Sequence, residues 1–186
     1  MKVHPAILFC SFVALCAQVL FCSGCASGYT RGSGQRAATA LGVSTGNPLS
    51  AVSVELSPNV KEKLKDSVRF DPQALLSSVV LALSNRQLLG TEKRKGVPVL
   101  EILVTHVRVG NSFNAIMWGA MSGHDCIEGD ITVRDATGGV IDQFHIDASY
   151  AFGEWAGGQD STRMTWLYDA FAKQVVNVLT GEAGNA

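Results

Sequence analysis

The stretch Ile127–Ala148, IEGDITVRDATGGVIDQFHIDA, alternates apolar and polar residues on both sides of the turn Thr137-Gly138-Gly139. Alternation places successive side chains on opposite faces of a strand, and a short glycine turn joins two antiparallel strands. The stretch therefore predicts a β-hairpin with one buried face. The residues expected on that face are Ile127, Ile131, Val133, Val140, Phe144, Ile146 and Ala148.

The segments before the hairpin predict two further strands and a short helix. Residues 51–56 alternate between apolar and polar, as expected for a strand that ends at Ser57-Pro58. Residues 98–109 are apolar on both faces, which is typical of a central strand. A short charged helix is expected over residues 58–65.

Two longer helices are predicted from apolar residues that recur at helical spacing. The first begins at the cap Asp71-Pro72 and is expected to close at Gly90. The second is the last element of the chain, from about residue 160 to Gly181. The order strand, helix, strand, hairpin, helix predicts an α+β two-layer sandwich, with a mainly antiparallel sheet and two main helices on one face.

The N-terminus predicts export. Residues 1–24 contain Lys2 and then an apolar run of 16 residues from Ala6 to Phe21, shorter than the ~20 residues a membrane-spanning helix needs. Small residues follow the run, as at the cleavage site of a signal peptide. The alternatives are an ordinary secreted protein cut near Gly24 or Ala26, and an uncleaved membrane helix.

The segment Cys22-Ser23-Gly24-Cys25, with Leu20 upstream, resembles the signal of bacterial lipoproteins. That resemblance implies that the Cys25 thiol receives diacylglycerol, that the chain is cut before Cys25, and that the new amino group is acylated. Two or more acyl chains make a stable membrane anchor. The resemblance also implies transport to the outer membrane, facing the periplasm, because Ala26 is not the Asp of lipoproteins retained in the inner membrane.

The rest of the chain divides into a tether, a domain and a tail. Residues 25–50 hold the modified cysteine and a segment rich in Gly, Ser, Thr and Ala, which predicts a flexible tether spanning roughly 25–30 Å. Residues 51–181 form the periplasmic domain, and residues 182–186 are expected to be disordered. Cys126 is the one thiol left after processing, so the mature chain has no internal disulfide.

Charge argues against nucleic acid as a partner. The chain has 15 Lys and Arg against 16 Asp and Glu, so there is no basic excess to neutralise a phosphate backbone. A hydrophobic content of 47% with 17% charged residues excludes a disordered chain.

The second half resembles a family of bacterial lipoproteins called domain of unknown function 4410. The resemblance rests on Leu100-Glu101-Ile102-Leu103-Val104, on Gly129-Asp130-Ile131-Thr132-Val133 with the turn after it, and on the loop Gly153–Gly158. It covers roughly residues 51–179 and implies a periplasmic α+β lipoprotein. It implies no chemistry.

Cys126 is the candidate nucleophile of a cell-envelope hydrolase, with His106 or His145 as its partner. A catalytic thiolate is commonly stabilised by a helix N-terminus and an adjacent histidine. A strand pattern follows Cys126 instead of a helix, so we expect a buried thiol and no catalytic residue.

Metal ligands are also present around this cysteine: His124, Asp125, Cys126, Glu128 and Asp130. Strand alternation sends Cys126, Glu128 and Asp130 to one face and Asp125 to the other, and the paired spacing of a structural zinc site is missing. Any metal would need distant partners, so we expect neither a metal nor a cofactor. The glycine-rich loop at 153–158 lacks the lysine and the spacing of a phosphate-binding loop.

The most unusual connection is the apolar segment from Phe113 to Met121 between two predicted strands. Contiguous exposed apolar area often marks a contact with a partner. Ile116, Met117, Trp118 and Trp155 are therefore the candidate partner surface. The prediction is a non-catalytic binding or accessory lipoprotein with an envelope protein as partner. The alternatives are the Cys126 hydrolase and a carrier of a small apolar ligand.

Overall fold

The computed structural model describes residues 28–31, 43, 47–65, 70–90, 97–109, 125–150 and 160–182. They form a five-stranded sheet of order β1-β5-β4-β3-β2 and three helices. The sheet is mixed, since β2 and β3 are parallel and the other pairs antiparallel. The elements are β1 (Gly28–Arg31), β2 (Ala51–Leu56), α2 (Pro58–Lys65), α3 (Pro72–Asn85), β3 (Val99–Arg108), β4 (Asp125–Arg134), β5 (Val140–Tyr150) and α5 (Asp160–Thr180).

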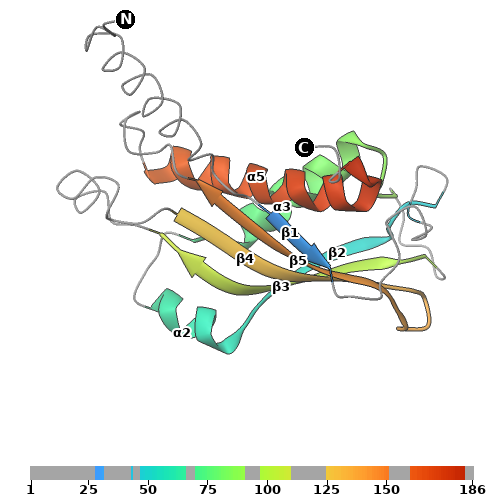
Figure 1. Ribbon diagram of the computed structural model, residues 1–186, viewed down its shortest axis with the longest axis horizontal. Helices are drawn as coiled ribbons and strands as arrows, with labels where there is room; N and C mark the ends of the chain where they lie inside the picture. The colour runs from blue at the N-terminus through green and yellow to red at the C-terminus, as the bar shows by residue number, and fades with distance from the viewer. Residues whose placement is uncertain are drawn as a thin grey trace, which may run out of the picture.

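Helices α3 and α5 cover one face of the sheet and confirm the predicted α+β sandwich (Figure 1). Helix α5 packs on β4 and β5, whereas α3 packs on α5 and β2. Helix α2 follows β2 directly, contacts β3, and lies on the other side of the strands in Figure 1. The apolar stripe of α5 is buried as its spacing predicts, at Met164, Leu167, Tyr168, Phe171, Val175, Val176 and Leu179.

The predicted hairpin forms from β4 and β5, with two differences near its turn. Val140 is 53% exposed, although the alternation placed it on the buried face. The register shifts between Val133 and Arg134, and Asp142 takes the buried position opposite Val133. The burial of this carboxylate is compensated by an ion pair with Arg31 of β1, at 2.8 Å.

Helix α3 begins as predicted and ends earlier. The side chain of Asp71 accepts a hydrogen bond from the backbone N–H of Gln73 and caps the helix. The helix stops at Asn85 instead of Gly90, because the chain turns through the positive φ of Gln87 and leaves the helix axis. Leu89 then forms a parallel bridge with Leu49, which is fully buried.

Strand β1 lies within the segment that sequence analysis assigned to the tether. Gly28 to Arg31 pair with β5 and form one edge of the sheet. Val43 and Leu49, from the same segment, belong to the hydrophobic core. The described parts of residues 25–50 are therefore components of the folded domain.

In the part of the chain described here, no helix combines the length and apolar character needed to cross a membrane.

Candidate functional site

The face of the sheet opposite α3 and α5 is polar. Ile127, Ile131 and Val133 of β4 turn toward the helices and are fully buried. Because side chains alternate along a strand, Cys126, Glu128 and the even-numbered residues after them point to the opposite face.

A β-bulge in β3 brings a histidine to this polar face. Val104 pairs with Gly129, but His106 pairs with the next residue of β4, Glu128. Thr105 is thus the extra residue, and the bulge reverses the phase of the side chains that follow it. Without the bulge, His106 would share the helix-facing side with Val104. With it, His106 stands directly across from Glu128.

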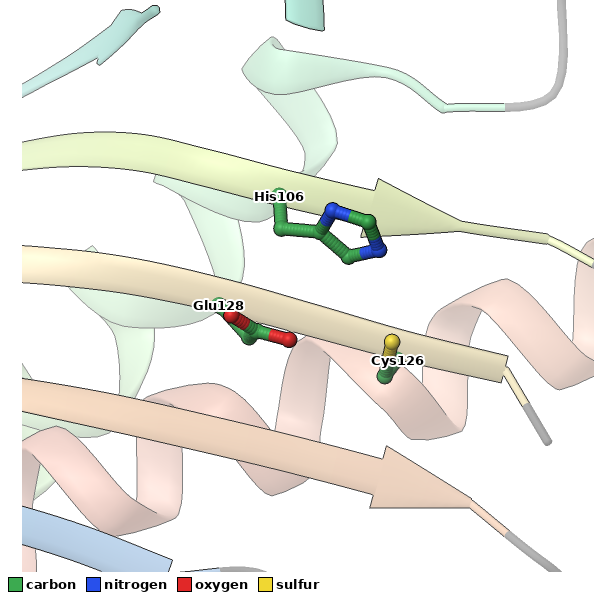
Figure 2. Close-up of side chains that lie close together, drawn as sticks. All are labelled: His106, Cys126 and Glu128. Atoms are coloured by element: carbon green, nitrogen blue, oxygen red, sulfur yellow. The ribbon is translucent and has the colours of Figure 1, made fainter.

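His106, Cys126 and Glu128 form the candidate site (Figure 2). The close-up shows His106 on β3, with Cys126 and Glu128 side by side on β4. Their ligand atoms all lie within 4.8 Å of one another. Cys126 is 8% exposed, while the other two side chains are partly exposed. A nitrogen, a sulfur and an oxygen ligand therefore converge on two adjacent strands, which is a set of groups that can hold a metal ion.

The surroundings of the thiol keep it protonated. Burial is the largest cause that raises the pKa of Cys126, and the carboxylates of Glu128 and Asp147 raise it further. Arg108, across from Cys126 in β3, lowers it in part. Cys126 lies in strand β4 and not at the start of a helix, whereas a catalytic cysteine needs its thiolate stabilised. The fold does bring His106 near the thiol, but the raised pKa of Cys126 gives no support to a hydrolase.

Acidic groups extend the site onto β5. Glu128 pairs in register with Asp147, and Asp130 with His145. His145 Nδ1 lies 2.8 Å from Asp130 Oδ1, and His145 Nε2 lies 4.0 Å from Glu128 Oε2. One oxygen of Asp147 is buried without a hydrogen-bond partner. Such an atom is costly in a folded protein unless a donor or a cation satisfies it.

The family model described as "Domain of unknown function (DUF4410)" matches residues 37–154. The chain belongs to this family. The matched region includes β2 to β5, and with them all three residues of the candidate site. The sequence resemblance to DUF4410 is thereby confirmed, and the family assigns no chemistry.

Solved structures resemble this DUF4410 chain weakly. Two are PelC dodecamers from Paraburkholderia phytofirmans, at 12% and 13% identity with TM-scores of 0.43 and 0.45; the alignments cover 78% of this chain and 97% and 94% of those chains. A PDZ domain protein from Parabacteroides distasonis is 12% identical with a TM-score of 0.37, over 81% of this chain and 35% of that one. At these scores the similarity assigns no role. No curated protein matches.

The structure separates the residues that sequence analysis considered. Asp125 is buried on the helix side and pairs with Arg163 of α5, as alternation predicts. Cys126 and Glu128 lie together on the polar face of the sheet. The residue that joins them there from a distant part of the DUF4410 sequence is His106. The lipid site Cys25 and the candidate partner surface, Ile116, Met117, Trp118 and Trp155, lie outside the described residues.

Sequence reasoning missed the bulge, although the sequence contains a signal of it. Every even position from Leu100 to Val104 is apolar, whereas after Thr105 the apolar residues, Val107 and Val109, stand at odd positions. A change of phase within one strand is typical of a β-bulge. This signal would have placed His106 on the same face as Glu128.

Two hollows at the surface bear on the carrier alternative. One lies between α3 and α5 and includes Leu81 and Lys173 in its lining. The other lies on the polar face of the sheet, beside Glu101 and Asp130. Neither lies between the sheet and the helices, where buried side chains such as Phe171 fill the space. These hollows do not favour a carrier of apolar ligands.

Proposed function

We propose that this chain is a lipid-anchored protein of the bacterial cell envelope, on the outer membrane and facing the periplasm, and that its DUF4410 domain is a non-catalytic binding or accessory module. The anchor is supported by the apolar run before Cys25 and by the lipoprotein-like residues around it. The non-catalytic role is supported by Cys126, whose pKa is raised and not lowered.

The observation that carries this proposal is the position of β1. Strand β1 begins at Gly28, three residues after Cys25, and Gly28 pairs with Asp147 near the end of β5. Three residues of fully extended chain reach about 11 Å at most. A lipid on Cys25 would therefore hold this end of the sheet close to the bilayer. That is a shorter connection than the flexible tether expected from composition.

The candidate partner residues are flanked by elements at the same end of the sheet. β3 ends at Arg108 and β4 begins at Asp125, so the connection with Ile116, Met117 and Trp118 starts and finishes there. The connection that contains Trp155 starts at the end of β5, which pairs with Asp125. In this proposal, the domain meets its envelope partner next to the membrane surface.

The anchor is tested by the intact mass of the protein extracted from membranes in detergent. We expect the mass of residues 25–186 plus acyl chains, and we expect the Cys25→Ala variant to lose it. An unmodified soluble wild-type chain would overturn the localisation.

The orientation is tested with fluorophores in vesicles that contain brominated lipids. One label is placed at Arg108→Cys, at the anchored end, and a matched label at Thr137→Cys, in the opposite turn; both are made in the Cys126→Ser background. The 11 residues of β5 span roughly 35 Å, so we expect strong quenching at 108 and little at 137. Equal quenching at both positions would show that β1 does not orient the domain.

The partner surface and the hydrolase alternative are tested separately. We expect Trp118→Ser to reduce recovery of an envelope protein in detergent pull-downs, while the circular dichroism spectrum stays unchanged. Unchanged recovery would remove Trp118 from the partner surface. Cys126→Ser should leave that recovery intact, whereas a hydrolase would lose its activity completely.

A further inference from the structure

We propose that His106, Cys126 and Glu128 form a binding site for a divalent transition-metal ion, with Zn²⁺ as its preferred occupant. The site joins β3 to β4 on the face of the sheet opposite α3 and α5. It does not depend on the lipid anchor or on a protein partner, since every residue in it lies within the folded domain.

The geometry needs little change to close around an ion. Zinc binds histidine nitrogen and carboxylate oxygen at about 2.0–2.2 Å and thiolate sulfur at about 2.3 Å, so tetrahedral ligand atoms stand roughly 3.3–3.8 Å apart. The three ligand atoms already lie within 4.8 Å of one another. The ligand atoms therefore need to approach one another by at most about 1.5 Å to reach bonding distance. At the site, β4 is paired on both sides and His106 of β3 pairs with Glu128, which holds the positions of the ligands.

The charges around the site favour a cation. Glu128 and Asp147 are paired directly across β4 and β5, an arrangement of like charges that destabilises a sheet. One Asp147 oxygen is also buried without a partner. A divalent ion held by Glu128 would offset the repulsion and satisfy the nearby Asp147 carboxylate. Arg108 is the neighbouring positive charge that opposes the ion.

The ligand types select the metal. Magnesium and calcium prefer sites made of oxygen ligands. A set of one imidazole, one thiolate and one carboxylate suits zinc, and copper competes for it at higher affinity in general. Three protein ligands leave the fourth tetrahedral position for water or for another nearby carboxylate. Cobalt(II) can replace zinc in such sites and reports thiolate ligation by its colour.

The test uses the full-length chain, purified in detergent, reduced, and stripped of metal with a chelator. We expect one Zn²⁺ per chain by elemental analysis after gel filtration, and a higher midpoint of thermal unfolding when Zn²⁺ is added. With Co²⁺ we expect a sulfur-to-metal charge-transfer band. A wild-type protein without this band or without stoichiometric zinc would overturn the proposal, whatever the variants do.

The variants separate the ligands from their neighbours. Cys126→Ala should abolish the cobalt band while retaining every cysteine of the N-terminal segment, and His106→Asn and Glu128→Gln should each weaken Zn²⁺ binding at least about tenfold. Thr132→Val is the matched control on the same face of β4, four residues from Glu128, and should bind as wild type does. Equal binding by Cys126→Ala and wild type would contradict the assignment.

Discussion

The ring of Phe171 in α5 lies 3.2 Å from the point that a Cβ atom on Gly129 in β4 would occupy. The carbonyl oxygen of Leu103 lies 3.3 Å from the same point. Because Gly129 has no side chain, helix α5 can approach the centre of the sheet closely. The two sequence neighbours of Gly129, Glu128 and Asp130, point to the opposite, polar face. Adjacent residues of β4 thus serve both faces: Gly129 makes the core contact with Phe171, and Glu128 belongs to the candidate site.

We expect Gly129→Ala to destabilise the domain by about 1–3 kcal/mol, the usual cost of overpacking a core. Phe171 is fully buried and cannot move away freely. Urea denaturation of the variant and of wild type measures the difference. Gly28→Ala is the control, because a Cβ at Gly28 meets nothing within 4 Å. Equal midpoints for the two variants would contradict the close approach of Phe171.

A second prediction concerns the ion pair that fastens β1. Arg31 and Asp142 are 85% and 98% buried, respectively, and the Arg31 guanidinium also lies 5.7 Å from the centroid of the Phe144 ring. Arg31→Met leaves the Asp142 carboxylate buried without this partner, which should cost about 3–5 kcal/mol. Amide hydrogen exchange at Tyr29 and Thr30 should accelerate as β1 detaches.

The control for this pair is the exposed bridge between Arg86 and Glu182, whose side chains are 53% and 49% exposed. Glu182→Ala should change stability by no more than about 1 kcal/mol, because water screens such pairs. If Arg31→Met proved as mild as Glu182→Ala, β1 would not depend on the ion pair, and the short connection to Cys25 would lose its main support.

The hairpin and the helices could be predicted because their burial follows a simple period. The stripe from Met164 to Leu179 repeats at helical spacing, and Ile127, Ile131 and Val133 alternate as in a strand. Asp142 could not be predicted in the core, since its burial depends on Arg31, a residue 111 positions away. The same holds for β1, whose Gly28-Tyr29-Thr30-Arg31 has no period of its own and pairs only where β5 offers a free edge.

Only part of the candidate site could be predicted from the sequence, because alternation within a strand is local and pairing between strands is not. Cys126 and Glu128 are two residues apart on one strand, so alternation alone places them on one face. His106 is 20 residues before Cys126, and its place depends on which residue of β3 is the extra one in the bulge. Register between strands is a tertiary property, and it decides here which histidine meets the thiol.

A third prediction concerns pH and the hairpin turn. The Thr137 hydroxyl, then the backbone N–H groups of Gly139 and Thr137, donate hydrogen bonds to Asp135 and lower its pKa. The lowered pKa means that the ionised Asp135 carboxylate stabilises the folded state at any pH above the pKa of the unfolded chain, about 4. This stabilisation disappears as pH falls through the lower pKa of the folded state.

Thr137→Val removes the hydroxyl donor. The pKa of Asp135 should then rise toward its ordinary value, and acid destabilisation should begin at a higher pH. Carboxyl titration by NMR, with urea midpoints at several acidic pH values, measures both effects. Thr30→Val, on exposed β1, is the control and should leave the Asp135 titration unchanged. An unshifted Asp135 pKa in Thr137→Val would show that the backbone donors alone are sufficient.

The last prediction concerns the contact between α5 and the start of α3. The hydroxyl oxygen of Tyr168 accepts a hydrogen bond from the backbone N–H of Asp71, at 2.7 Å, and its ring meets Phe70 edge-on, with centroids 5.7 Å apart. Burial raises the pKa of Tyr168, and the Asp71 carboxylate also raises it, while the hydrogen bond from Asp71 lowers it. Tyr168→Phe keeps the ring but removes the acceptor, and should cost about 1–2 kcal/mol.

The pH dependence distinguishes this hydrogen bond from packing alone. In wild type, Tyr168 of the unfolded chain ionises at about pH 10, while Tyr168 of the folded protein stays protonated to a higher pH. The free energy of unfolding should therefore fall as pH rises from about 10 to the pKa of the folded state. Tyr168→Phe lacks this contribution and should show a smaller decline in urea midpoint above pH ~10. Tyr29→Phe, at the exposed edge, should follow wild type. If Tyr168→Phe and wild type declined equally, Tyr168 would ionise as readily in the folded protein as in the unfolded chain.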